Sequence, residues 1–280
     1  MNEEKTSTEN YLLGKDKDSF IRYQLFDDIY QPATKERFET LQIKPNMNIL
    51  EIGCGIGKTA LYMAKNIVPE GTVIAFDQAQ ALVDAANCLA SDSVINNVTF
   101  LCAKAQEYDY EKEYFDLVHT RYVLTYSPYA TDIMKKIYES LKFNGIFFGE
   151  EIYQAYAMHN QPKWFDNIMT WFGRLIEIGG GNPNYGLDKM PSDMFEAGFR
   201  DMNITAYLPL RDQSKIVKML RIAMSQEMKK SLIEYDIATA DEIDASVEEM
   251  TRQPKDSFIS SSMNIHITGV KSKAYTEKNS

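Results

Sequence analysis

The chain has 280 residues, which is enough for one α/β domain with insertions and a well-buried core. Its formal net charge is −10 at pH 7 and its isoelectric point is about 4.9. A field of that sign repels nucleic-acid phosphates and anionic lipid headgroups. The composition therefore argues against nucleic-acid and membrane partners.

The first periodic pattern is helical. Residues 18–41 carry apolar side chains at three- and four-residue spacing, which predicts a helix. Pro32 interrupts this segment, and a proline disfavours the helical conformation in the residue before it. We expect the helix to break before Pro32 and to resume afterwards. Three tyrosines of the N-terminal region are candidates for a lid over a functional site: Tyr11, Tyr23 and Tyr30.

Strand-like and helix-like segments then alternate. The expected strands are residues 47–52, 71–76, 98–102, 115–119 and 145–152. The helices expected between them are residues 58–66, 79–90 and 133–141. Such alternation implies βαβ units and a parallel sheet.

Beyond residue 152 the regular alternation of strand-like and helix-like segments ends. An aromatic segment, 153–178, ends at the helix stop Gly179-Gly180-Gly181-Asn182-Pro183, and a short helix follows at 191–197. Two β-like runs, 203–208 and 258–270, are separated by a helical insertion. We expect one compact domain, divided into an N-terminal helical lid (1–42), a Rossmann-like core (43–152), a helical cap (153–198), and closing strands (199–274) with an insertion at about 211–252.

Cysteines and histidines are few and scattered. Neither the three cysteines nor the three histidines show a spacing typical of disulfide frameworks or metal sites, so we predict no metal. Residues 1–9 are too polar for a signal peptide, and no apolar run reaches the roughly 20 residues that span a bilayer. A cytoplasmic location is expected.

A glycine-rich turn follows the first predicted strand. Gly53, Gly55 and Gly57 stand at alternate positions directly after Asn48-Ile49-Leu50-Glu51-Ile52. Glycine permits backbone angles that a Cβ would penalise, and it lets a ligand approach the main chain. The helix that follows presents unpaired N–H groups to the same place. The pattern predicts a cofactor site.

Three classes of cofactor compete for this turn. A dinucleotide motif needs its third glycine at position 58, which is Lys58, and a phosphate-binding loop needs a glycine at position 52, which is Ile52. Glu51 would also place an anion beside a pyrophosphate. The same carboxylate suits a cationic or zwitterionic ligand such as S-adenosylmethionine.

An acid at the end of the second strand supports a nucleoside ligand. Asp77 lies 20 residues beyond Gly57, where a carboxylate accepts hydrogen bonds from ribose hydroxyls. The alternative is that Asp77 caps the following helix.

With these motifs the chain resembles the class I S-adenosylmethionine-dependent methyltransferases, from about residue 11 to residue 270. The first motif is Leu50 to Gly57, Phe76-Asp77-Gln78 resembles the ribose motif, and residues 98–106 resemble the adenine motif. Tyr11-Leu12-Leu13-Gly14 and Gly180-Gly181-Asn182-Pro183 are closest to a bacterial small-molecule subgroup. The resemblance implies a seven-stranded, mostly parallel sheet with its last strand antiparallel, flanked by helices. It also implies these cofactor-binding residues: Tyr11, Glu51, Gly53, Cys54, Gly55, Gly57, Asp77, Gln78, Lys104, Ala105, Gln106 and Thr120.

Two departures affect the expected roles. Ala103-Lys104-Ala105 replaces the family's frequent Gly-Asp-Ala, and because a lysine side chain cannot accept from the adenine amine, that role falls to Gln106 or a backbone carbonyl. Tyr126 stands where many relatives have a histidine. Tyr126 and His119 are therefore the catalytic candidates, although a strand position such as His119 also suits packing or contact with the cofactor.

Ligands of open parallel sheets bind outside the carboxyl ends of the strands. This rule places the acceptor pocket beside the following residues: Arg121, Tyr126, Glu150, Glu151, Tyr153, Trp164 and Trp171. Arg121 has two interpretations, a buried ion pair with one of the carboxylates or a bidentate donor to an anionic acceptor. The aromatic residues of the cap form either its core or a wall of the pocket.

The resemblance implies transfer of a methyl group from S-adenosylmethionine to an O or N atom of a small molecule, by a monomer or homodimer. The alternatives are a protein or RNA methyltransferase, a non-methylating enzyme of the same fold such as an aminopropyl transferase, and a non-catalytic module that binds S-adenosylhomocysteine.

Overall fold

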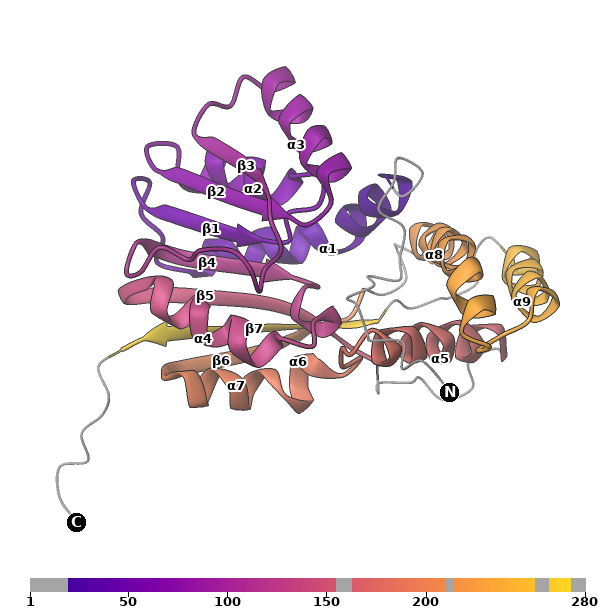
Figure 1. Ribbon diagram of the computed structural model, residues 1–280. Helices are drawn as coiled ribbons and strands as arrows, with labels where there is room; N and C mark the ends of the chain where they lie inside the picture. The colour runs from indigo at the N-terminus through magenta and orange to yellow at the C-terminus, as the bar shows by residue number, and fades with distance from the viewer. Residues whose placement is uncertain (1–19, 155–162, 210–213, 255–261, 273–280) are drawn as a thin grey trace, which may run out of the picture.

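A computed structural model of the chain describes residues 20–154, 163–209, 214–254 and 262–272. Its centre is a seven-stranded sheet in the order β3-β2-β1-β4-β5-β7-β6 (Figure 1). Strands β1 to β5 pair in parallel, and β7 runs antiparallel to both β5 and β6. The strands are β1 (Asn48–Ile52), β2 (Thr72–Asp77), β3 (Val98–Cys102), β4 (Phe115–Arg121), β5 (Leu141–Tyr153), β6 (Phe199–Tyr207) and β7 (Met263–Lys271). The predicted fold class is confirmed.

Helices cover both faces of the sheet. One face packs on α1 (Phe20–Thr40), α2 (Lys58–Tyr62) with the π-helical turn Met63–Ile67, and α3 (Gln80–Asp92). The other packs on α4 (Ala130–Ser140), α6 (Tyr185–Asp188) and α7 (Met190–Ala197).

Side-chain alternation along the strands sorts residues between these faces. Ile49 packs in the core beneath α1 to α3, and its neighbour Leu50 packs in the core beneath α4 to α7. Leu117 and Phe148, in β4 and β5, share the first face with Ile49. The residues two positions further along these three strands therefore point to the same side, under α1.

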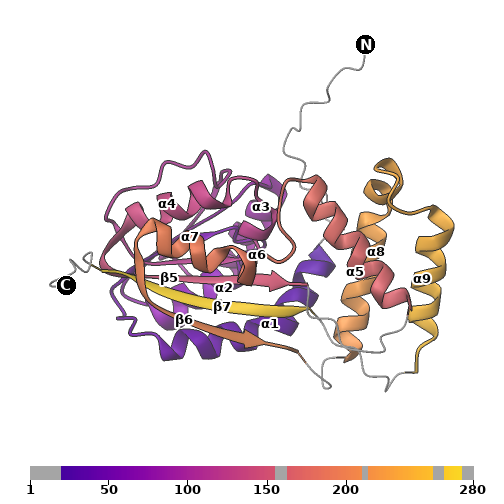
Figure 2. The same ribbon diagram turned by 90° about the horizontal axis from the view of Figure 1, so that it is seen from below.

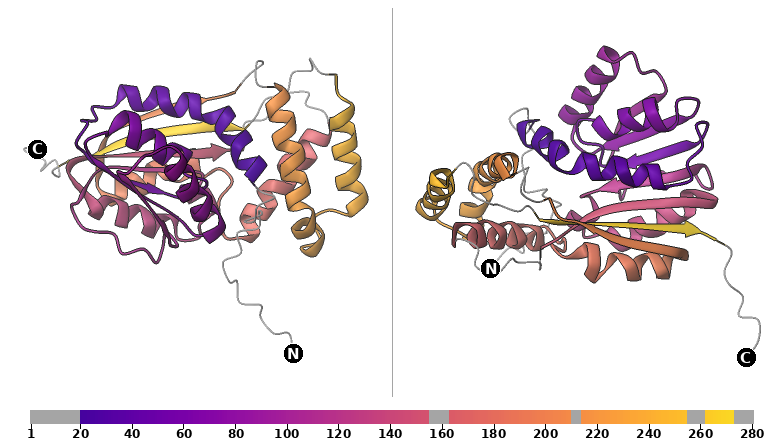
Figure 3. Two further views of the ribbon diagram at one scale, coloured as in Figure 1. Left: turned by 90° about the horizontal axis from the view of Figure 1, so that it is seen from above. Right: turned by 180° about the vertical axis from the view of Figure 1, so that it is seen from behind.

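Three helices form a cap beside the carboxyl ends of the parallel strands: α5 (Lys163–Ile178), α8 (Ser214–Glu234) and α9 (Ala240–Arg252) (Figure 2). They have a hydrophobic core of their own, which includes Trp164 and Trp171. Leu25 and Ile29 from α1 are part of that core, while Phe38 near the other end of α1 belongs to the sheet core. Helix α1 therefore joins the cap to the sheet, and it lies beside α8 (Figure 3).

The expected break before Pro32 is wrong, because α1 is one helix with Pro32 inside it. Packing on both sides of the proline overrides the local preference, since Tyr30 and Phe38 are each 1% exposed. The Thr34 hydroxyl oxygen also lies 3.1 Å from the Tyr30 carbonyl oxygen. Strand β5 likewise begins at Leu141, four residues before the expected start, because Leu141 pairs with Phe115.

Replacing Pro32 with alanine measures the destabilisation by the proline that this packing offsets. Pro32 is exposed, so the change removes few contacts, and proline is about 3 kcal/mol worse than alanine inside a helix. We expect Pro32→Ala to raise the free energy of unfolding by about 1–3 kcal/mol in urea titrations. Unchanged or lower stability would mean that α1 needs the proline geometry to meet both cores.

Candidate functional site

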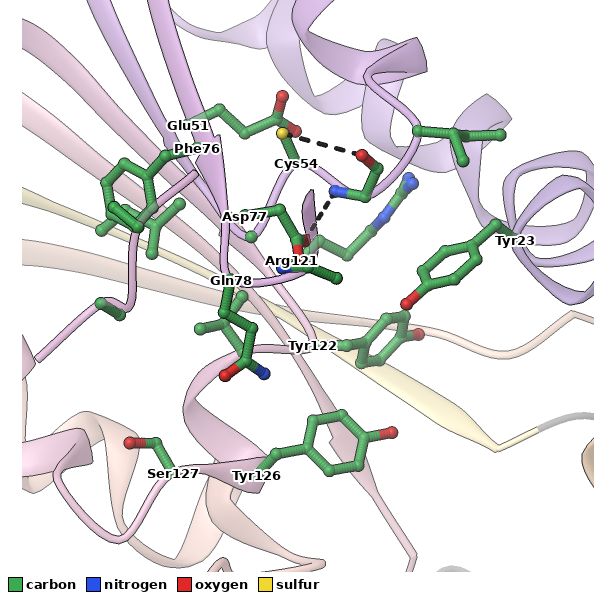
Figure 4. Close-up of a pocket in the computed structure, with 18 of the residues that line it drawn as sticks. Tyr23, Glu51, Cys54, Phe76, Asp77, Gln78, Arg121, Tyr122, Tyr126 and Ser127 are labelled. Carbon is green, nitrogen blue, oxygen red and sulfur yellow. Dashed lines mark hydrogen bonds between the residues drawn. The ribbon is translucent and has the colours of Figure 1, made fainter. Parts of the chain in front are cut away.

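A pocket opens at the carboxyl ends of the parallel strands. Its walls come from the glycine turn after β1, the end of β2, the turn after β4, the first half of α1 and Met224 of α8. Figure 4 shows Asp77, Gln78 and Tyr126 around this space, with Tyr23 and Tyr122 close to one another on another side.

The glycine turn is held against its neighbours by backbone geometry. Gly53 has φ +72°, and a Cβ there would overlap the Val123 side chain. The N–H groups of Gly53 and Cys54 both donate to the Phe76 carbonyl, at 2.8 and 3.0 Å. Gly57 has φ +80°, and a Cβ there would collide with Ala86 and Phe100. The alternating glycines thus let β1, β2, β4 and α3 meet closely.

Asp77 orders this turn as well as facing the pocket. Its Oδ2 accepts from the Gly55 N–H at 3.0 Å, and its Oδ1 accepts from the Ala79 N–H at 3.0 Å. Ala79 is the N-cap residue of α3. Because α3 has no side-chain cap hydrogen bond, the alternative that Asp77 caps this helix is wrong, and the carboxylate instead lines the pocket and orders the turns on either side of it.

A row of ionisable side chains crosses four strands on the face covered by α1. Glu51 of β1 is followed by His119 of β4, Glu150 of β5 and His266 of β7, and each of these residues is at most 4% exposed. The Nε2 of His119 lies 2.9 Å from Glu150 Oε1, and its Nδ1 lies 3.4 Å from Glu51 Oε1. The Nε2 of His266 lies 3.1 Å from Glu150 Oε2.

These contacts set the protonation of the row. Burial raises the pKa of Glu51, against the effect of the neighbouring His119. Burial alone would lower the pKa of His119, but the carboxylates of Glu150 and Glu51 raise it overall. Burial would raise the pKa of Glu150, yet hydrogen bonds from His119 and His266 bring it below its ordinary value. Glu150 is therefore the ionised centre of the row.

Helix α1 covers the row with matching polar groups. Thr34 donates to Glu150 Oε2 at 2.9 Å. Arg121, which follows His119 on β4, pairs with Asp27 and donates to Gln31 Oε1 at 2.9 Å. Of the two interpretations of Arg121, the structure shows the buried ion pair, and its partner comes from α1 rather than from Glu150 or Glu151.

Glu151 points to the opposite face and organises the turn after β4. Its carboxylate accepts from the N–H groups of Val123, Leu124 and Thr125 at 3.2, 2.8 and 3.1 Å. Burial raises its pKa to about 7, against the effect of these donors. The turn includes the 3₁₀ segment Leu124–Tyr126, so the hydrogen bonds to Glu151 fix the position of Tyr126.

Aromatic side chains form another part of the pocket wall. The Tyr122 ring lies 4.8 Å from that of Phe26 and 5.4 Å from that of Tyr30, both in edge-to-face geometry. Tyr122 has φ +56°, a left-handed conformation that costs a β-carbon residue about 1–3 kcal/mol. The strain turns its ring toward Phe26 and α1.

The structure divides the expected site residues into two groups. Ten of them line the pocket: Glu51, Gly53, Cys54, Gly55, Asp77, Gln78, Ala105, Gln106, Arg121 and Tyr126. Nine others do not belong to its lining: Gly57, Lys104, His119, Thr120, Glu150, Glu151, Tyr153, Trp164 and Trp171. Tyr11 lies outside the described residues.

The residues outside the lining have other contacts. Lys104 pairs with Glu107 at 3.1 Å, and Thr120 alternates with His119, so it points to the far face of β4. His119 and Glu150 are fully buried beneath Glu51 and Arg121. The Tyr153 ring packs with the sheet core. Trp164 and Trp171 follow the core alternative, because they pack inside the cap.

Sequence reasoning missed most of the wall that α1 and α8 provide. Arg22, Phe26, Asp27, Tyr122 and Met224 line the pocket, and of the α1 residues there only Tyr23 was expected as part of a lid. Asp27 and Gln31 lie one helical turn apart on the predicted helix, so this pair of polar side chains on one face was the available signal.

The pocket fits a nucleoside-bearing cation. Glu51 Oε2 is buried and has no hydrogen-bond partner within the described ranges, so it can accept from a ligand. Asp77 supplies a carboxylate at the end of β2. Together with the antiparallel β7, these features define a Rossmann-like methyltransferase fold.

Residues 43–223 match the family model described as a methyltransferase domain. The chain therefore belongs to this family of S-adenosylmethionine-dependent methyltransferases, whose cofactor leaves as S-adenosylhomocysteine.

Relatives of known name and structure share only part of the sequence. The demethylmenaquinone methyltransferase of Lactococcus lactis is 25% identical over 152 residues, which is 53% of this chain and 59% of that protein. The match thus spans less than two thirds of that relative's length. Methyltransferase str2 of Strobilurus tenacellus is 25% identical over 220 residues, 76% of this chain and 74% of that protein.

A solved structure shows the same fold. Phosphoethanolamine N-methyltransferase 2 of Haemonchus contortus, in complex with phosphomonomethylethanolamine and S-adenosylhomocysteine, superposes with a TM-score of 0.57 at 16% identity. The superposition covers 92% of this chain and 58% of that one. Over the described ranges, no helix combines the length and apolar character that a membrane crossing requires.

The buried row makes stability depend on pH. Because the folded state raises the pKa of His119 above 6.5, it keeps a proton that the unfolded chain releases. The contribution is complete below pH 6.5 and is lost as the pH rises through the folded-state value, at up to about 1.4 kcal/mol per pH unit. We expect urea unfolding of the wild type to show this loss and His119→Gln to flatten it. Parallel pH profiles for the two proteins would show that folding leaves the pKa of His119 unchanged, which would contradict the prediction.

Proposed function

We propose that the protein transfers the methyl group of S-adenosylmethionine to an O or N atom of a small molecule. The observation that carries this proposal is one continuous pocket that joins the carboxylates of Glu51 and Asp77 to the aromatic residues Phe26, Tyr122 and Tyr126. One end suits the methyl donor and the other an apolar or aromatic acceptor.

The donor end is argued from acceptor atoms. Asp77 is placed to accept from ribose hydroxyls, and the free Oε2 of Glu51 is placed to accept from an ammonium group. Among the adenine-motif residues that line the pocket, Gln106 is the one with a polar side chain, whereas Lys104 faces Glu107. S-adenosylmethionine supplies an already activated methyl group, so the protein's main task is alignment and exclusion of water.

The acceptor end is argued from shape and polarity. Helix α1 covers the pocket from one side and Tyr126 and Tyr129 border it on another, which favours a small acceptor over a polymer. Aromatic faces there would stabilise the sulfonium cation as well as a flat acceptor. The Lactococcus relative is named for a small molecule, demethylmenaquinone, which agrees with this assignment.

No observation favours a second function as strongly. A protein or RNA methyltransferase would need a docking surface, and the net charge of −10 opposes RNA. An aminopropyl transferase or a non-catalytic S-adenosylhomocysteine module would bind related ligands in the same turn. Product analysis with labelled S-adenosylmethionine separates these cases, because methyl transfer alone releases S-adenosylhomocysteine. We propose a monomer or a homodimer as the working state.

The donor assignment predicts that Asp77→Ala weakens binding of both S-adenosylmethionine and S-adenosylhomocysteine. The expected loss is about 1.5–3 kcal/mol, the scale of a hydrogen bond to a charged group. Calorimetry would measure it, with the exposed Asp84→Ala on α3 as the control. Since Asp77 also orders the Gly55 N–H, unfolding is measured in parallel. Normal affinity in a folded variant would leave Asp77 with only that ordering role.

Tyr126→Phe tests the acceptor end, because it removes one hydroxyl and keeps the ring that packs near Phe172. If the hydroxyl orients the acceptor or handles its proton, turnover falls about 10²-fold or more while affinity for S-adenosylhomocysteine is unchanged. Tyr114→Phe, outside the pocket lining, is the matched control. Full turnover in Tyr126→Phe would leave alignment and desolvation as the whole mechanism.

A further inference from the structure

Two arginines, Arg22 and Arg121, line the pocket, and a third, Arg221, is buried on α8 near the lining residue Met224; the three differ in their partners. Arg22 pairs with Glu227 at 2.8 Å, and Arg121 pairs with Asp27. Arg221 of α8 makes no ion pair with any carboxylate of the described residues, although its side chain is as deeply buried as that of Arg22. Among the described residues, this buried cation near the pocket therefore has no carboxylate partner.

The guanidinium of Arg221 has few and neutral contacts. Its Nη2 donates to Ser262 Oγ at 3.1 Å, and its Cζ lies 5.7 Å from the centre of the Phe165 ring. Its Nε is buried and has no hydrogen-bond acceptor in the part of the chain that the structure describes. The residue is 2% exposed, so bulk water does not solvate it. Burial accordingly lowers the pKa of Arg221.

A buried arginine without an ionic partner destabilises the folded protein in the absence of a ligand. The effective penalty for burying an unpaired ion is several kcal/mol, and one hydroxyl and one ring recover only part of it. The protein pairs the other two arginines of this region with carboxylates, as this penalty requires. An anion that arrives with a ligand would complete the third pair.

The position of Arg221 connects it to the pocket. Met224 lies three residues further along α8, on the same side of the helix, and lines the pocket. The hydroxyl groups of Tyr122 and Tyr126, two other lining residues, lie within electrostatic range of the guanidinium. Ser262, which accepts from Arg221, also accepts from the Tyr30 hydroxyl through its carbonyl at 3.2 Å. Phenol groups and the guanidinium thus form one polar end of an otherwise aromatic space.

We propose that Arg221 binds an anionic oxygen group of the methyl acceptor, a carboxylate or an ionised phenol or enol, on the side of the pocket that Met224 lines. This inference rests on the proposed function and narrows its substrate class from small molecules to acids with a flat apolar body. Tyr126 borders the acceptor, and Arg221 fixes the anionic group of the acceptor by a bidentate interaction.

Stability provides the first test. Replacing an unpaired buried ion with an apolar residue of similar volume is neutral or stabilising, whereas removing one partner of a pair is destabilising. We expect Arg221→Met to unfold at or above the wild-type temperature, and Arg22→Met, which strands Glu227, to unfold several degrees lower. A clear drop for Arg221→Met would show that the arginine serves the fold, and it would overturn the proposal.

Binding provides the second test, in protein saturated with S-adenosylhomocysteine. The probes are two matched pairs, 4-methoxybenzoate with 4-methoxybenzamide, and 4-nitrophenol with 4-nitroanisole. We expect the anion of at least one pair to bind at least tenfold more tightly than its neutral partner. The pair that responds distinguishes a carboxylate from a phenolate. The preference should vanish in Arg221→Met, diminish in Arg221→Lys, and persist in Arg174→Met, an exposed arginine of α5.

Each other result counts against the inference. Equal binding of anion and neutral partner, a preference that survives in Arg221→Met, or no binding of either anion would reject it. Binding of S-adenosylhomocysteine in the same titrations separates the two proposals. If the wild-type protein does not bind S-adenosylhomocysteine, the proposed function is rejected. If it binds S-adenosylhomocysteine but shows no preference for the anions, only the role of Arg221 is rejected.

Discussion

The buried row Glu51–His119–Glu150–His266 is the constraint on which the rest of the structure depends. Each member loses its hydration on folding, and that loss is recovered only when all four strands align in one register. A slip of one residue would turn every side chain of a strand to the other face. The same row requires a polar cover, which α1 provides through Thr34. The electrostatics of the row therefore fix both the register of these four strands and the helix that covers them.

Local patterns revealed the sheet and the cofactor turn, because their signals are short-range. Alternating glycines after an apolar run, and an acid after the next strand, need only the geometry of one βαβ unit. Arg121 shows where such reasoning ends. Its partner Asp27 lies 94 residues away, on a helix whose direction over the sheet no local pattern encodes. The contact of Glu150 with His266 likewise depends on the antiparallel placement of β7.

The packing of the cap explains the remaining differences between the expected and the observed positions of residues. Trp164 and Trp171 are aromatic, carry amphipathic spacing and follow β5, so they suit a pocket wall as well as a core. The choice is decided by α8 and α9, which pack on α5 from later in the chain and bury both rings. Pro32 is the converse case, since a strong local preference yields to burial at Tyr30 and Phe38. In both cases, tertiary packing outweighs the local signal.

Helix α1 belongs to two hydrophobic cores at once, with Leu25 and Ile29 in the cap and Phe38 in the sheet. The cap is therefore not a module that can be exchanged by cutting the chain after β5. A chimaera that takes α5, α8 and α9 from a relative must also take the first half of α1, more than 120 residues earlier in the chain. The sequence of that half-helix and the sequence of the cap are therefore expected to change together. The choice of acceptor then depends on the same residues that cover the methyl donor.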